Sequence, residues 1–352
     1  MKTLVLAASL LTAAALPPAA IEQQPTLDGT WRARLQDNWT RKDGQQWVSL
    51  QMDQDDDHHF GISIPMDELQ GLGARGERWT ASGVRFSVRR DAGTVDFQGN
   101  FSDGRGTGTW QFSPNAEFVS TMRKTYQDLS PEQVFRLAIH DVSRSFVASM
   151  SQEGYVRPSL DDLTRMRIHG VDAVYVQGLK KAGYSNLTIG ELVKTRIHGA
   201  TPAFAQEVSA AGLGKLSVDD LVKMRIHGVT PEFIRELRDL GYKDLGVDDV
   251  VKLRIHGASV SFIREMRDLG YKDLALNDVV RMRIHGVSAE YVKELKSLGY
   301  SNLSVEDLVR MRIHGVTPQF IRDVNAAGFK NMSADDLVDF SIHGRRWLKK
   351  RA

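Results

Sequence analysis

The sequence predicts an α+β protein of two domains, a small antiparallel β sandwich or barrel followed by an α-solenoid. Three observations lead to this fold class. Residues 21–125 alternate apolar and polar side chains between Gly- and Asp-containing turns, and residues 130–344 repeat every 29 residues without a gap. The 352-residue chain also has an ordinary globular composition, 41% hydrophobic and 26% charged. The absence of cysteine excludes a disulfide framework, a thiolate zinc site and a cysteine nucleophile.

Residues 1–20 have the pattern of a secretory signal peptide. Lys2 precedes an apolar run over residues 4–16, and the small residues at 13–15 suit a cleavage site. The run is shorter than the ~20 apolar residues that a membrane-spanning helix needs. We therefore expect an exported, periplasmic protein, with an uncleaved N-terminal anchor as the alternative.

Residues 21–125 are expected to form the antiparallel β domain, with about six short strands. The alternation of Val84, Phe86 and Val88 with polar residues is typical of a strand that buries one face. Asp91-Ala92-Gly93 and Asp103-Gly104 suit tight hairpins, because Gly and Asp tolerate positive φ. The other strands are expected around residues 29–35, 47–52, 60–64, 95–99 and 107–111.

One cluster in this domain has metal-ligand chemistry. Carboxylates and imidazoles lie close together between two expected strands, and such groups bind divalent cations. The spacing matches no defined site and lacks the glycine and distal glutamate of an EF-hand loop. We interpret the segment as a solvated acidic hairpin tip, and the alternative is a metal site built from Asp55, Asp57, His58 and His59.

The dominant feature of the chain is a repeated tetrapeptide, Arg-Ile-His-Gly. Counting variants at both ends, its histidine recurs every 29 residues, so eight of the ten histidines occupy one repeat position. Seven units of 29 residues and a final 12 predict an array of stacked helical hairpins. The repeat histidines are His140, His169, His198, His227, His256, His285, His314 and His343.

The first helix of each unit is exemplified by the segment that follows Ser217. Ser217 is the expected N-cap, and Gly228 takes the left-handed position that ends the helix. Leu221, Val222 and Ile226 are expected to form its apolar stripe.

The second helix begins at a capping residue and ends at a glycine in every unit. Thr230 with Pro231 begins one such helix, Phe233 is its buried aromatic residue, and Gly241 ends it. The capping column is Ser143, Asp172, Thr201, Thr230, Ser259, Ser288 and Thr317; the aromatic column is Phe146, Tyr175, Phe204, Phe233, Phe262, Tyr291 and Phe320. The glycine column is Gly154, Gly183, Gly212, Gly241, Gly270, Gly299 and Gly328.

The repeat histidines are interpreted as structural residues. Each falls at a helix C-terminus, where an imidazole can hydrogen-bond free carbonyl groups and pack between hairpins. The alternative is a response to pH, since histidine titrates near neutrality. A shared metal is not expected, because packed helices lie ~8–10 Å apart whereas zinc holds each nitrogen at ~2 Å.

An arginine lies two residues before six of the repeat histidines and has two interpretations. It pairs with an acidic column on a neighbouring helix, or it lines a groove that binds carboxylates of an extended peptide or cell-wall fragment. The arginine column is Arg167, Arg196, Arg225, Arg254, Arg283 and Arg312. The acidic column is Asp162, Glu191, Asp220, Asp249, Asp278 and Asp307.

The charge distribution narrows the class of partner. Residues 130–344 carry 28 Lys/Arg against 28 Asp/Glu, so a nucleic-acid partner is not expected. Residues 345–352 carry five basic residues and no acid. This basic tail is either a terminal cap or a segment that associates with an anionic membrane surface.

Several of these motifs occur together in a known setting. The stretch from Val84 to Phe112, then Ile139-His140-Asp141-Val142-Ser143, then the Arg-Ile-His-Gly-Val-Thr-Pro units resemble the extracytoplasmic accessory region of bacterial β-lactam-sensor-type regulatory metallopeptidases. The His-Glu-x-x-His helix of the peptidase itself is absent, so protease activity is not implied. The resemblance implies a sensing or interaction module.

The sequence therefore predicts a non-enzymatic, exported scaffold that binds a protein or peptide. It contains no G-x-S-x-G, phosphate-binding glycine loop or zinc-peptidase motif, so we expect no cofactor. The alternative is a cell-wall-directed hydrolase whose catalytic carboxylates lie in the β domain or in the 53–59 cluster, with Asp56, His58 and His59 as the residues to test. The sequence does not fix the oligomeric state.

Overall fold

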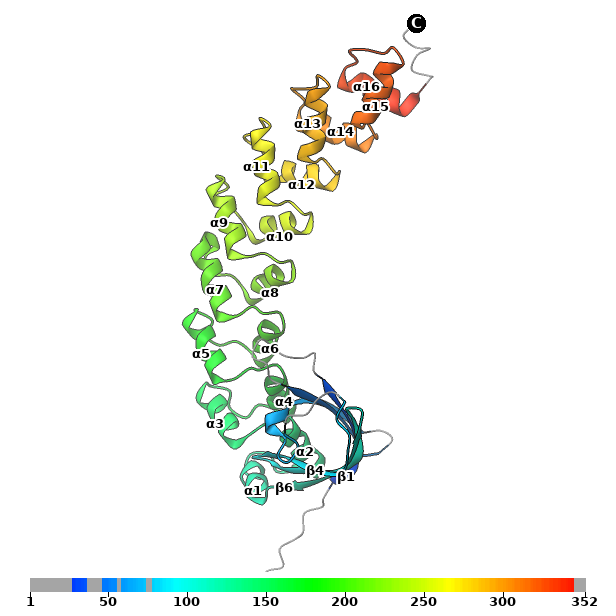
Figure 1. Ribbon diagram of the computed structural model, residues 1–352. Helices are drawn as coiled ribbons and strands as arrows, with labels where there is room; N and C mark the ends of the chain where they lie inside the picture. Colours follow the sequence, from blue (N-terminus) through cyan, green and yellow to red (C-terminus); the bar gives the residue numbers. More distant parts are fainter. Residues whose placement is uncertain (1–26, 37–45, 56–57, 74–77, 345–352) are drawn as a thin grey trace, which may run out of the picture. The chain divides into compact units, whose positions relative to one another are not determined.

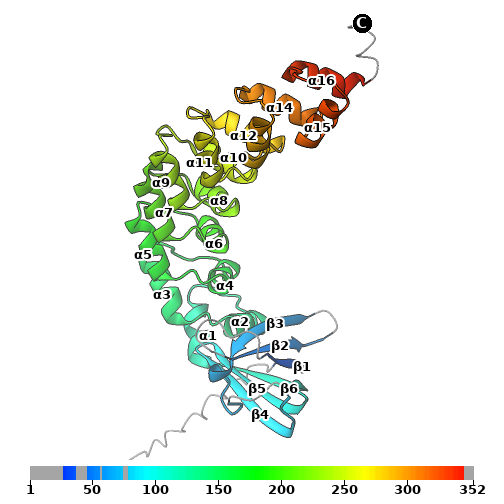
Figure 2. The ribbon, with the colours of Figure 1, turned by 45° about the horizontal axis from the view of Figure 1, so that its top comes forward.

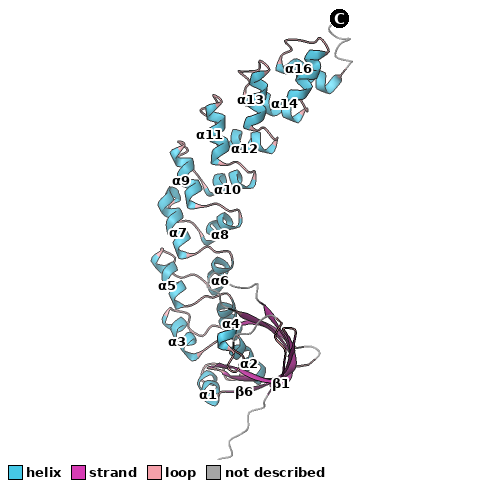
Figure 3. Ribbon diagram, viewed as in Figure 1, coloured by secondary structure: helices cyan, strands magenta, loops and turns pink. Residues whose placement is uncertain are grey.

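The computed structural model describes residues 27–36, 46–55, 58–73 and 78–344. Within them the predicted fold class is confirmed: an antiparallel sheet is followed by helices packed as an α-solenoid (Figure 3). The chain forms two compact units, unit 1 with Met1–Ser151 and Tyr155–Thr164 and unit 2 with Gln152–Gly154 and Arg165–Ala352. The expected signal peptide and basic tail lie outside the described residues.

Unit 1 contains a single six-stranded antiparallel sheet with the strand order β3-β2-β1-β6-β5-β4. The segment after β3 reaches the opposite edge strand, where the backbones of Gln70 and Ser87 exchange two hydrogen bonds of 2.9 Å. The sheet is thus a curled, partly closed form of the expected barrel. The strands are β1 (Leu27–Gln36), β2 (Trp47–Asp53), β3 (His59–Pro65), β4 (Ala81–Arg90), β5 (Gly93–Ser102) and β6 (Arg105–Pro114).

The two faces of the sheet differ in chemistry, as the alternation predicts. One face is apolar and buried. Trp31 lies flat across β5 and β6, where its Nε1 donates to Gln98 O at 3.2 Å and Thr109 O at 3.0 Å. Only glycine fits beneath this ring, because a Cβ on Gly106 would approach the Trp31 ring to 2.6 Å.

Helix α2 (Pro131–Ile139) covers part of the apolar face. Its Phe135 stacks on Trp110 with ring centroids 4.8 Å apart and also contacts Phe112 and Phe60. The first repeat therefore belongs to unit 1.

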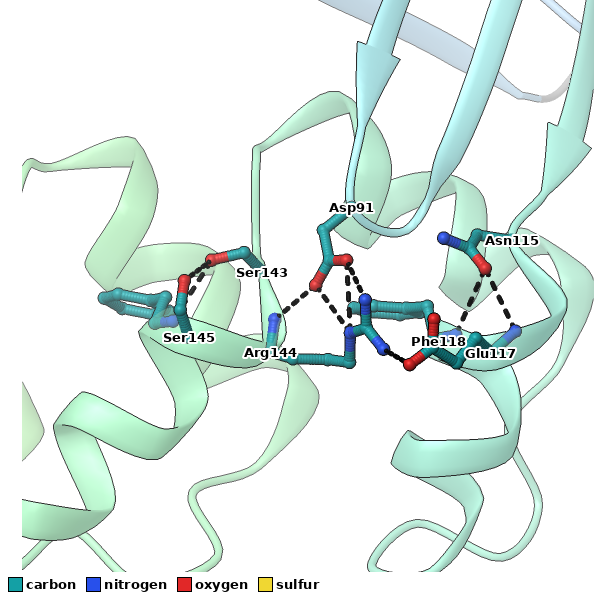
Figure 4. Close-up of polar contacts among 8 residues, drawn as sticks. Asp91, Asn115, Glu117, Phe118, Ser143, Arg144 and Ser145 are labelled. Atoms are coloured by element: carbon teal, nitrogen blue, oxygen red, sulfur yellow. Dashed lines mark hydrogen bonds and ion pairs between the residues drawn. The ribbon is translucent and has the colours of Figure 1, made fainter.

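An ion pair ties the next helix of the first repeat to the sheet. Arg144 begins α3 (Arg144–Gln152), and its guanidinium donates to both carboxylate oxygens of Asp91 in the β4–β5 hairpin (Figure 4). It also pairs with Glu117 at 2.5 Å, which lies in the first turn of α1 (Ala116–Arg123). Hydrogen bonding from Arg144 lowers the pKa of Asp91.

Unit 2 is a regular array in which alternate helices pack on each other. Even-numbered helices form one row and odd-numbered helices the other (Figures 1 and 2). From α4, which crosses the unit boundary, the helices are α4 (Leu160–Ile168), α5 (Ala173–Lys181), α6 (Ile189–Ile197), α7 (Pro202–Val208), α8 (Val218–Ile226), α9 (Pro231–Asp239), α10 (Val247–Ile255), α11 (Val260–Asp268), α12 (Leu276–Ile284), α13 (Ala289–Ser297), α14 (Val305–Ile313), α15 (Pro318–Ala326) and α16 (Ala334–His343).

The predicted caps of the repeats are confirmed. Thr230 accepts from the backbone N–H of Phe233 at 3.2 Å, and the other capping residues bond their aromatic residue in the same way. The glycines that end the second helices all have φ between +93° and +107°. Only a residue without Cβ adopts this backbone readily.

A tyrosine after this glycine links successive repeats. Tyr242 donates to Leu274 O at 2.8 Å, and Tyr271 donates to Leu303 O at 2.9 Å. Two units differ: Leu213 occupies the tyrosine position after a π-helical turn, Ser209–Leu213, and Phe329 occupies it in the last full unit. Burial raises the pKa of the Tyr242 and Tyr271 hydroxyls, which keeps them protonated donors.

Candidate functional site: the Arg-Ile-His ridge

The Arg-Ile-His-Gly motif lies at the C-terminal end of the even-numbered helices. The histidine is the C-cap residue, and its backbone N–H closes the last turn, as in His256 N to Lys252 O at 3.2 Å. The glycine that follows is left-handed, with a φ of +65° at Gly257. The predicted end of the first helix is therefore confirmed.

Five arginines of the motif each lie against the aromatic ring of the preceding repeat. In α10, the Arg254 guanidinium carbon is 5.0 Å from the centroid of the Phe233 ring, and Arg254 Nε donates to Gly228 O at 2.9 Å. The equivalent distances for Arg196, Arg225, Arg283 and Arg312 are 4.7 to 5.1 Å.

This stacking corrects the expected partner of the arginine column. None of Arg196, Arg225, Arg254, Arg283 and Arg312 forms an ion pair with a described residue. The aromatic ring, and for Arg254 and Arg283 also a glycine carbonyl, holds the guanidinium in place without neutralising it. These five cations are therefore available to a carboxylate outside the chain.

The acidic column instead caps its own helices. Asp220 Oδ2 accepts from the Ser217 hydroxyl at 2.7 Å, and the Ser217 hydroxyl accepts from the Asp220 backbone N–H at 3.0 Å. Full capping boxes occur at Thr188 with Glu191 and at Ser304 with Asp307. Hydrogen bonding to Ser304 lowers the pKa of Asp307.

An ion-pair ladder between repeats exists, but other residues form it. The basic residue four positions before the histidine pairs with the first turn of the next even-numbered helix, as in Lys194 with Asp219 and Lys223 with Asp248. Lys252 makes the equivalent hydrogen bond to Asn277 at 2.9 Å. Lys194, Lys223 and Lys252 are thus already partnered within the chain, unlike Arg196, Arg225, Arg254, Arg283 and Arg312, which have no ionic partner among the described residues.

The isoleucine of the motif faces solvent in every repeat of unit 2. The expectation that Ile226 belongs to the buried stripe of α8 is wrong: Ile226 is 58% exposed, whereas Leu221 and Val222 are buried. The exposed fractions of Ile168, Ile197, Ile226, Ile255, Ile284, Ile313 and Ile342 lie between 51% and 58%. We call the line formed by the arginine, isoleucine and histidine columns the Arg-Ile-His ridge.

The histidine rings contribute little to the array. Among the described residues, His343 is the only repeat histidine whose ring makes a hydrogen bond, to Asp339 O at 3.1 Å. The expected carbonyl bonding by the rings is thus found at one position only, while the backbone of the histidine closes each helix.

The first repeat departs from this pattern. Ala138 replaces the arginine, Ile139 is only 9% exposed, and both residues lie in the helix that packs on the sheet. Burial lowers the pKa of the neighbouring His140. The isoleucine position is therefore covered in the one repeat in which the chain supplies a covering surface.

The acidic cluster of unit 1 consists of separate pairs in its described part. His58 Nδ1 lies 2.8 Å from Asp55 Oδ1, and His59 Nδ1 lies 2.7 Å from Asp53 Oδ1. Asp53 also accepts from Arg32 at 2.9 Å. No group of three or more ligating side chains suited to a metal occurs in the described segments, and Asp56 and Asp57 lie outside them.

The polar face of the sheet contains a hollow of about 770 Å³. Its floor includes one row across four strands, in which Asp28 and Asp96 lie on either side of Gln111. Arg85 of β4 lies in the next row, opposite Gln98. Sequence reasoning placed catalytic carboxylates in this domain in general terms but did not single out Asp28 and Asp96.

The exposed isoleucine column is the feature that sequence reasoning missed. Its signal is present in the repeats, because isoleucine occupies the position in all eight motifs, whereas the buried positions beside it vary among valine, leucine, methionine, threonine and phenylalanine. A buried position tolerates exchange among apolar residues of similar volume.

Neither the protein-family models nor the curated proteins contain a match to this chain. None of the helices in the described segments has the length and apolar character that crossing a bilayer requires.

Proposed function

We propose that this chain is an exported, non-enzymatic scaffold of the bacterial cell envelope whose solenoid binds a protein or peptide along the Arg-Ile-His ridge. The observation that carries this proposal is the column of seven isoleucines, each more than half exposed, five of which lie beside an arginine without an ionic partner among the described residues: Arg196, Arg225, Arg254, Arg283 and Arg312. Export and the sensing role rest on the N-terminal pattern and on the resemblance to metallopeptidase accessory regions.

The exposed isoleucines of the ridge add little to the stability of the fold. An exposed isoleucine gains only part of the free energy of burial, and it adds an apolar patch that favours non-specific association. An exposed column on the second helices is less constant, since it contains glutamine, arginine and lysine: Gln206, Arg235, Arg264, Lys293 and Arg322. Repeated contact with a partner accounts for the constancy of the ridge.

The first repeat supports the same interpretation. Its isoleucine, Ile139, is buried within unit 1, and its arginine position holds Ala138. The arginine is thus absent from the motif that is already covered and present in six of the seven motifs that are open, the last of which has Ser341 instead. A partner that covers the open motifs would remove the isoleucines from water in the same way.

The test is a comparison of three proteins as bait in an envelope extract. The first is the wild-type mature chain, and the second carries I226S/I255S/I284S. The third is a matched control, R235S/R264S/K293S, on exposed second-helix positions of the same three repeats. The proposal predicts a saturable partner that the wild type and the control retain and the ridge variant loses; equal retention by all three would refute it.

A cell-wall-directed hydrolase is the second candidate, and the hollow of unit 1 is the observation that favours it. Asp28 and Asp96 are two strand spacings apart, or ~9.6 Å between backbones, which is compatible with the ~6.5–9.5 Å between carboxyl groups in inverting glycosidases. Both carboxylates are exposed, whereas the acid of such enzymes lies in a desolvated pocket. Turnover of labelled peptidoglycan fragments that D28N and D96N abolish would establish this alternative.

A further inference from the structure

The ridge presents the same three side chains, arginine, isoleucine and histidine, in six successive repeats from Arg167 to His314, so its partner must offer matching groups at the same interval. This inference rests on the proposed function and names the class of partner. The helices that carry the ridge pack in sequence, α6 on α8, α8 on α10, α10 on α12 and α12 on α14. Packed helices lie ~8–10 Å apart, which sets the interval between motifs.

Among regular backbones, polyproline II matches this interval. Three of its residues advance ~9.3 Å and return the side chain to the same face. A β-strand returns to the same face after ~6.7 Å or ~13 Å, and an α-helix after ~10.5 Å for seven residues. Polyproline II can therefore stay in register over several repeats, and it is preordered, which lowers the entropy lost on binding.

The charges of the ridge select the side chains of this partner. The Arg225, Arg254 and Arg283 guanidiniums lie over aromatic rings, and the Nε of Arg254 and of Arg283 is engaged by a glycine carbonyl. The terminal nitrogens remain as donors, and a carboxylate accepts two such donors in parallel. Arg225, Arg254 and Arg283 have no acidic partner among the described residues, whereas Lys194 and Lys223 pair with Asp219 and Asp248, so a carboxylate from a partner can neutralise the charge of these three arginines.

The isoleucines distinguish a peptide from other polyanions. The three isoleucines at 226, 255 and 284 each expose more than half of their surface beside the arginine. A phosphate or sugar polymer offers carboxylates or phosphates without apolar groups to cover these side chains. A peptide offers both in adjacent residues.

We infer that the ridge binds an extended peptide in the polyproline II conformation, with a carboxylate residue and an apolar residue repeated every third position. One carboxylate meets one arginine, and the adjacent apolar side chain covers one isoleucine. Successive triplets of the peptide occupy successive repeats of unit 2.

The experiment measures the affinity of the mature chain for synthetic peptides by fluorescence anisotropy. The probe is a peptide of six Glu-Leu-Pro triplets, and the register control, three copies of Glu-Pro-Glu-Leu-Pro-Leu, has the same composition with glutamates two and four residues apart. A peptide of Lys-Leu-Pro triplets and a polyphosphate test the charge and the apolar contact. We expect the Glu-Leu-Pro probe to bind at least about tenfold more tightly than each of these.

Variants then locate the binding site. R225A/R254A/R283A and I226S/I255S/I284S should each weaken the Glu-Leu-Pro peptide at least about tenfold, while R235A/R264A/K293A, which removes the same number of cations, should not. Circular dichroism checks that each variant is folded.

The outcomes separate the two proposals. Equal binding of the in-register and register-control peptides overturns the polyproline II inference, as does tighter binding of polyphosphate. If no peptide binds although the ridge variant still loses a partner from the extract, the partner class is wrong and the proposed function stands. If no peptide binds and the ridge variant loses nothing, both proposals fail.

Discussion

Two isoleucines of one repeat provide a sharp test of how the ridge differs from the core. Ile255 ends α10 and is 55% exposed, whereas Ile263 lies within α11 and is fully buried. Replacing a buried isoleucine by alanine typically costs 2–5 kcal/mol, because burial is lost and a cavity forms. Burial of a whole isoleucine contributes ~1.5–3 kcal/mol, so the half-exposed Ile255 contributes about 1 kcal/mol or less.

Alanine also has the higher helix propensity, which reduces the cost at both sites by a few tenths of a kcal/mol. We therefore expect I263A to lower the free energy of unfolding by at least 2 kcal/mol and I255A by less than 1 kcal/mol. Urea denaturation followed by circular dichroism at 222 nm reports on the helices of the array. A loss for I255A as large as that for I263A would refute the claim that the ridge isoleucines are dispensable for folding.

Three further predictions concern the framework that presents the ridge. Y271F removes the hydroxyl that donates to Leu303 O and should lower the free energy of unfolding in urea by ~0.5–1.5 kcal/mol; an unchanged urea midpoint would show that this bond does not couple repeats. Arg144 lowers the pKa of Asp91, so this pair stabilises the fold above about pH 4 and its contribution is lost as the pH falls through the lowered pKa. R144M should therefore flatten the decline of thermal stability below pH 4, and parallel wild-type and variant pH profiles would contradict this assignment. G228A places a Cβ on a residue with a φ of +66° and should cost ~1–2 kcal/mol by urea denaturation; a neutral effect would mean that the helix end rearranges easily.

The sequence contains the signals for most of the solenoid. Thr230 with Pro231, and Gly241 eleven residues later, mark the start and the end of a helix through local backbone chemistry, and the structure has both ends where these residues predict them. Local signals of this kind depend on few neighbours, which is why they can be read without a structure.

Predictions that depended on a neighbouring repeat were less successful. Ile226 follows Val222 by four residues and continues the apolar stripe of α8, yet the packing neighbours do not cover the last turn of the helix. The partner of Arg254 was equally open from sequence, because local patterns do not show which column of a neighbouring repeat the arginine contacts. The spacing of Ser217 and Asp220 does indicate a capping box, and this signal could have removed the acidic column from the choice.

The packing of the first repeat on the sheet also depends on residues that are distant in the sequence. Phe135 occupies a position that holds valine or threonine in the other units, and Ala138 occupies the position of the arginine column. Both residues suit a helix that packs on the sheet, but no local sequence pattern indicates that α2 does so. The structure supplies that connection through the stacking of Phe135 on Trp110.

Site-specific photo-crosslinking in the native cell envelope tests the central claim most directly. A photoreactive phenylalanine analogue replaces Ile255 on the ridge in one strain and Arg264 on the second helix of the same repeat in another. The account predicts a discrete crosslinked partner from the ridge position alone, and its loss when Arg225 and Arg283 are changed to alanine in the same chain. The same partner crosslinked from both positions, or a ridge crosslink that survives loss of both arginines, would contradict it.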